Sequence, residues 1–189
     1  MSVIIEGIQS RVKYLGTFDL KEFYRAVREE LIDRGYINSE SYKYMEPYYS
    51  EKVSSDPKEA KTIWFWWRAK KDESSYFQKR MDIDFHLRFL KDVEVMVDNE
   101  KKRVQQGEIE VLFHTYLMLD PNDKWEKHWF LSRVHPLFYR RLWRKRREER
   151  KNSVIGDCYR VQAIIKNYFE IKSFIARGEA FVPAYGYKR

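Results

Sequence analysis

Apolar positions 20, 23, 27 and 31 recur with the period of an amphipathic helix. Asp19 precedes this run and Glu22 follows three residues later, which is the spacing of a capping box. Gly35 stands just beyond the last apolar position, where a left-handed residue commonly ends a helix. The pattern therefore predicts an N-terminal helix over about residues 20–34.

Further along the chain the period changes from helical to two. Odd positions from 81 to 89, and then 93, 95 and 97, are apolar, and 109, 111, 113 and 117 repeat the pattern. The polar segment 99–107 between them is typical of a loop, and Val97 opposite Ile109 keeps all these side chains on one face. We expect a long antiparallel hairpin over about 80–98 and 108–118.

Residues 61–70 predict another strand, with an apolar run on both faces. Trp64 and Trp66 share one face of it with Arg68 and Lys70. On an open sheet these rings would form a stacking platform for single-stranded nucleic acid. The alternative is that both rings fill the core between sheet and helices.

The C-terminal part reads as helical, over about residues 132–151 and 154–176, with Asn152 and Ser153 between the two helices. We expect a sheet domain over 1–131 and a helical hairpin with a tail over 132–189, packed together as one folding unit. The fold class is α+β with an antiparallel sheet, because no alternation of strand and helix typical of parallel sheets is present.

Nearly all the excess positive charge lies in one segment. Residues 132–151 hold nine Lys or Arg and two Glu, so they account for +7 of the formal net charge of +8. Like charges one turn apart on a helix repel, and an anionic partner such as nucleic acid would relieve that repulsion. The candidate binding residues are Arg140, Arg141, Arg144, Lys145, Arg146, Arg147, Arg150 and Lys151. The alternative is a solvated helix balanced by Glu148, Glu149 and acidic neighbours on the sheet.

Apolar residues accompany these cations only as far as Trp143. We expect the helix to be held on the core up to that residue and to project from it over Arg144 to Lys151.

Asp82, Asp84 and His86 alternate on one strand and so share a face. Such a set could hold a divalent metal or act in acid–base chemistry. Arg80 and Arg88 flank it and disfavour a cation, so cross-strand ion pairs are the simpler interpretation. In the expected register, His114 would pair with Asp92.

The usual nucleotide-binding, hydrolase and zinc motifs are absent from the sequence, so it predicts neither an enzyme nor a bound cofactor. Cys158 is the only cysteine and is expected to pack as a small apolar side chain. A single cysteine, no secretory signal pattern and no apolar stretch of membrane-spanning length together favour a cytoplasmic protein.

Three binding roles remain. The leading hypothesis is a non-enzymatic protein that binds nucleic acid, RNA in preference to DNA, through the basic helix. The second is a structural or assembly subunit, as in a viral particle, which self-associates or docks on acidic protein surfaces. The third is attachment to an anionic membrane surface, with Leu137, Phe138, Leu142 and Trp143 beside the arginines.

Overall fold

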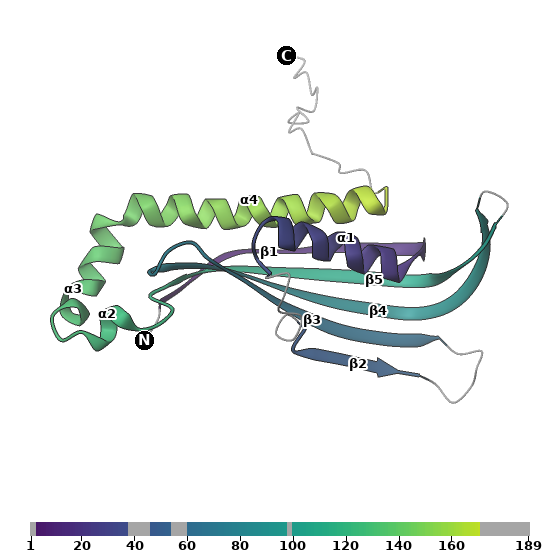
Figure 1. Cartoon of the computed structure of the whole chain (residues 1–189), viewed down its shortest axis with the longest axis horizontal. Coiled ribbons are helices and arrows are strands. Elements are labelled where there is room, and N and C mark those ends of the chain that lie inside the picture. Colours follow the sequence, from purple (N-terminus) through teal and green to yellow (C-terminus); the bar gives the residue numbers. More distant parts are fainter. Residues whose placement is uncertain (1–2, 38–45, 54–59, 98–99, 171–189) are drawn as a thin grey trace, which may run out of the picture.

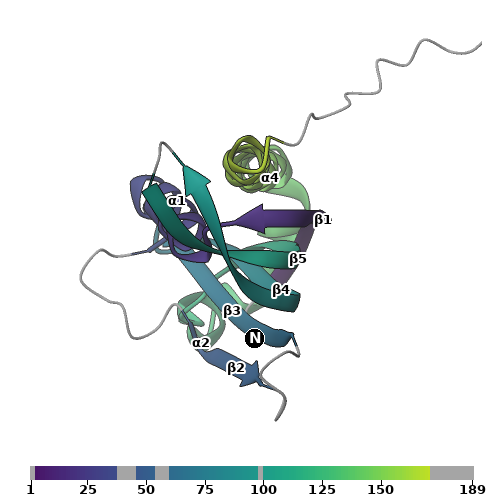
Figure 2. The ribbon, with the colours of Figure 1, turned by 90° about the vertical axis from the view of Figure 1, so that its right-hand side faces the viewer.

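The computed structural model describes residues 3–37, 46–53, 60–97 and 100–170. It contains a five-stranded antiparallel sheet in the order β1-β5-β4-β3-β2, with β1 and β2 at its two edges (Figures 1 and 2). The predicted α+β class with an antiparallel sheet is thus confirmed. The strands are β1 (Val3–Phe18), β2 (Tyr48–Lys52), β3 (Lys61–Asp72), β4 (Phe77–Val97) and β5 (Glu100–Leu119).

Helices α1 (Leu20–Asp33) and α4 (Arg144–Tyr168) lie over the same face of the sheet (Figure 1). Alternation along the strands places the odd apolar positions of β3, β4 and β5 beneath them. Phe23, Val27 and Leu31 of α1, and Cys158, Val161 and Ile165 of α4, complete this main core. The opposite side is the open face of the sheet.

The ends of α1 follow from local chemistry, as the sequence predicts. The Asp19 carboxylate accepts hydrogen bonds from the backbone N–H groups of Lys21 and Glu22, at 2.9 and 3.1 Å. Gly35 has a φ of +70°, a conformation that a glycine adopts without steric cost.

The central hairpin is longer and more tightly joined than expected. Ile109 lies opposite Leu87 instead of Val97, and Val97 lies opposite Glu100, so the predicted register was wrong. Most of the polar segment 99–107 continues β5, and the loop prediction was wrong as well. This part of the hairpin extends past the helices, so neither of its faces is covered and both can be polar. The additional paired residues add hydrogen bonds between the two strands.

A β-bulge lies between Arg88 and Lys91, where the pairing of β4 with β5 shifts. Phe89 has a φ of +55° and is 67% exposed, while Leu90 beside it is buried. The extra residue therefore changes which positions of β4 face the core.

The C-terminal helices are divided at a different place from the predicted one. After α2 (Lys124–Lys127), α3 (Leu131–Leu137) runs into a π-helical turn, η2 (Phe138–Leu142), and the direction changes at Trp143. Asn152 and Ser153 lie inside α4, where tertiary contacts override their weak helix preference. Ser153 Oγ, for example, accepts a hydrogen bond from Lys79 Nζ at 2.8 Å. Residues 171–189, including the end of the second predicted helix and the tail, lie outside the described residues.

A second, smaller core lies at the end of the sheet near α2 and α3. Leu117, Leu119 and Val154 pack there with an aromatic cluster that consists of Tyr76, Phe77, Trp125, Tyr139 and Trp143. The buried Asp120 carboxylate accepts hydrogen bonds from the N–H groups of Lys124 and Trp125 at 2.9 and 2.8 Å, which fixes the start of α2 to the sheet. No helix in the described part of the chain is long and apolar enough to span a membrane.

Candidate nucleic-acid interface

Five of the eight cations predicted as binding residues are exposed around the bend between η2 and α4. They make no ion pair with any carboxylate that the structure describes. We call them the basic cluster: Arg140, Arg141, Arg144, Lys145 and Arg146. The π-helical turn carries the first two, and the first turn of α4 carries the other three.

The remaining three predicted residues are partly engaged with the protein. Arg147 pairs with Glu148 at 2.8 Å and donates to the Tyr139 carbonyl oxygen at 3.3 Å. Arg150 pairs with Glu73 at 2.6 Å, and Lys151 is half-buried. Because Arg150 binds the turn between β3 and β4, the first turns of α4 are held against the sheet. The expected free projection of Arg144 to Lys151 was wrong.

The basic cluster occupies an electrostatically unfavourable position. The first turn of α4 contains no acidic residue, and no side chain caps it. Cations at the positive end of a helix dipole each cost about 0.3–1 kcal/mol. The local field also acts on Glu148: the hydrogen bond from Arg147, together with the charges of Arg147, Lys151 and Arg144, lowers the pKa of its carboxyl. A bound anion would relieve this repulsion.

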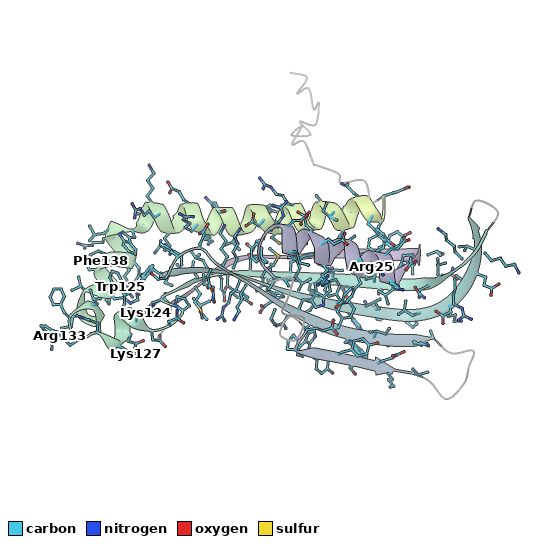
Figure 3. The ribbon with its side chains drawn as sticks, in the orientation of Figure 1. Arg25, Lys124, Trp125, Lys127, Arg133 and Phe138 are labelled. Carbon is cyan, nitrogen blue, oxygen red and sulfur yellow. The ribbon has the colours of Figure 1, made fainter. Side chains whose placement is uncertain are left out.

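More cations and two exposed rings adjoin the basic cluster. Figure 3 shows Lys124, Lys127 and Arg133 at the end of the molecule formed by α2 and α3, far from Arg25 on α1. Trp129 and Phe130 are 75% and 53% exposed in the same region. This end of the molecule therefore combines cations with accessible aromatic surface.

Only half of the apolar residues considered for membrane attachment face outward. Leu137 and Leu142 are 49% and 63% exposed. Phe138 and Trp143 pack against Trp125, with ring centroids 5.4 and 5.6 Å from its own.

Trp64 and Trp66 lie on the open face, so the alternative in which they fill the core was wrong. Trp66 is 39% exposed, stacks on Tyr48 at 4.2 Å between centroids, and has the Arg68 guanidinium 5.4 Å from its ring. Trp64 stacks on His86 at 4.9 Å. The main core instead contains the rings of the neighbouring odd-numbered residues, Phe65 and Trp67.

Asp82, Asp84 and His86 share the open face, and the two carboxylates are paired. Arg68 lies 2.6 Å from Asp84 and 3.7 Å from Asp82. Burial lowers the pKa of His86, which favours its neutral form. The described residues include no group of three or more His, Cys, Asp or Glu placed to hold a metal. His114 lies opposite Asp82, so its expected pairing with Asp92 was wrong.

The juxtaposition of Lys70 and Arg80 could not be predicted from the sequence, because it arises from the pairing of β3 with β4. The two cations lie directly opposite each other on the open face, and neither has an ion pair among the described residues. Like charges in this arrangement destabilise a sheet.

Lys70→Glu is therefore expected to stabilise the protein by about 0.2–1 kcal/mol, since the new carboxylate can pair with Arg80. Urea unfolding at neutral pH measures the change, and the gain should shrink in high salt. Lys52→Glu, at an exposed position of β2 that faces Thr62, serves as the control. A loss of stability in Lys70→Glu would show that Lys70 already has a favourable partner.

Neither a protein-family model nor a curated protein matches this sequence.

Proposed function

We propose that this protein binds nucleic acid, RNA in preference to DNA, and that it does so without catalysing a reaction. The observation that carries the proposal is the basic cluster, five exposed cations without ion pairs among the described residues, at the positive end of a 25-residue helix. Phosphates would neutralise these cations and release counterions from the nucleic acid. Contacts of this kind are largely independent of sequence.

The preference for single strands, and with it for RNA, rests on the rings beside the cations. Trp129 and Phe130 are exposed and meet edge to face, with centroids 5.7 Å apart, close in sequence to Arg133. Unpaired bases stack on such rings, and single-stranded regions are the usual target of sequence-reading RNA-binding proteins. We include a reducing, cytoplasmic setting in this proposal, because Cys158 is a buried free thiol.

The test is charge reversal in the basic cluster. Arg141→Glu, Arg144→Glu and Arg146→Glu together should weaken binding to a labelled single-stranded RNA on the order of 100-fold at low salt. The slope of log affinity against log salt should fall by about two, since each lost contact to a single strand accounts for roughly 0.7. Fluorescence anisotropy across a salt series measures both quantities.

The matched control reverses three exposed cations elsewhere: Lys21, Arg25 and Arg160. Both triple variants have the same net charge, so equal losses would contradict a localised site. Unchanged affinity in the first variant would contradict the proposal. Single-stranded DNA of the same length tests the RNA preference. If the protein does not bind RNA but sediments with anionic liposomes, the basic cluster would be assigned to a membrane surface instead.

A further inference from the structure

Several charged side chains on the open face are joined in a network of ion pairs. Besides the contacts of Arg68, Arg88 lies 2.6 Å from Glu108 and 3.1 Å from Glu110, and these carboxylates also pair with Lys13 and Arg11. Lys70 and Arg80 stand apart from this network. Arg80 Nε donates to Gln78 Oε1 at 2.8 Å, and no carboxylate of the described residues lies within ion-pair distance of its guanidinium.

These two cations line a hollow of about 640 Å³ on the open face. Its other charged lining residues are Arg68 and Asp82, which lie 3.7 Å apart, so the lining carries three cations and one carboxylate. Ile4, Tyr116 and Met118 give the hollow apolar surface, and Ile4 is 56% exposed. The volume falls within the range of small-molecule sites, about 300–1,000 Å³.

We propose that this hollow binds a small amphipathic anion, with an oxyanion head between Lys70 and Arg80 and an apolar body against Ile4, Tyr116 and Met118. The guanidinium of Arg80 can donate two parallel hydrogen bonds to a carboxylate or phosphate, and Lys70 adds a compact charge across the strand pair. Oxyanion binding would remove the repulsion between the two cations. Contact of the body with the apolar side chains would release water from surface that is now exposed.

The site is separate from the proposed nucleic-acid interface in both residues and chemistry. Its lining comes from β1, β3, β4 and β5 and includes no member of the basic cluster. The Arg141→Glu, Arg144→Glu, Arg146→Glu variant should therefore keep it intact, so failure of one proposal leaves the other standing.

The experiment is a titration of the full chain with decanoate, followed by the backbone amide signals in two-dimensional NMR. We expect saturable shifts centred on Ala69, Lys70, Arg80 and Tyr116, while acetate, which has the head alone, should cause none at the same concentrations. Adenosine 5′-monophosphate carries a flat ring system in place of the alkyl chain, so it tests which kind of apolar body the hollow accepts. Saturable shifts at these four amides with either ligand support the site.

Lys70→Gln with Arg80→Gln should weaken decanoate binding about tenfold or more, which corresponds to about 1.4 kcal/mol. Lys21→Gln with Arg25→Gln removes the same charge from α1 and should leave the affinity unchanged. Lys70→Glu should abolish binding in a protein that is at least as stable, which separates loss of the site from unfolding. Shifts centred elsewhere, or equal affinity in the Lys70→Gln, Arg80→Gln variant, would overturn the inference.

Discussion

Lys79→Met is expected to destabilise the protein by about 1.5–3 kcal/mol, one of the two largest effects we predict for a single substitution. The Lys79 side chain is only 4% exposed, and its ammonium lies 3.0 Å from Glu73 and 3.4 Å from Asp157. Methionine fills a similar volume but removes the cation that these two largely buried carboxylates share, which leaves Glu73 with Arg150 and Asp157 with Arg34. The loss also removes one contact between α4 and the sheet, because Asp157 belongs to that helix.

Urea unfolding followed by circular dichroism measures this effect. Lys70→Met is the matched control, since Lys70 lies on the open face of the neighbouring strand and its removal relieves repulsion with Arg80. We expect the control to change stability by less than about 0.5 kcal/mol. A loss below about 1 kcal/mol in Lys79→Met would mean that Glu73 and Asp157 do not depend on its charge.

Trp67→Ala should cost about 3–5 kcal/mol, whereas Trp66→Ala one position earlier should cost about 1 kcal/mol or less. Trp67 is fully buried, and its ring lies 4.8 Å from those of both Tyr24 and Phe85. Its indole N–H also donates to Glu46 at 3.0 Å. Trp66 points to the opposite face, where Tyr48 covers it only in part.

Thermal and urea unfolding of the two variants, side by side, test which face of β3 is covered. The pair is internally controlled, because both substitutions remove the same side chain from the same strand. Equal losses would contradict the assignment of α1 and α4 to the face that holds Trp67.

Features set by neighbouring residues could be predicted from the sequence. The Asp19 cap, the Gly35 stop and the alternation of residues 81–87 each involve only a few consecutive positions, and the structure agrees with all three. The fold class followed because such local signals gave strands and helices without a parallel β–α–β order.

Features set by distant contacts could not be predicted in the same way. The register of the hairpin depends on how closely the strands are joined, and the bulge at Phe89 changes their alternation. Inside α4, Ser153 is stabilised by Lys79, which is 74 residues away. In the candidate interface, the sequence identified the cations but not which of them Glu73 would engage. Lys70 and Arg80 became a pair only through strand pairing.

The separation of the two cores has a consequence for local unfolding. Along β4, Phe77 of the second core lies four residues from Met81 of the first, about 13 Å at the rise of a strand, so the two cores are separate but adjacent. The segment 124–143 is fastened there by the aromatic cluster, the Asp120 cap and a hydrogen bond of 2.7 Å between Tyr76 and His135, and we expect it to open while the main sheet stays folded. Amide hydrogen exchange in this segment would then report ligand binding to the basic cluster, because a ligand that binds only the closed form slows exchange by a factor of one plus the free ligand concentration divided by its Kd.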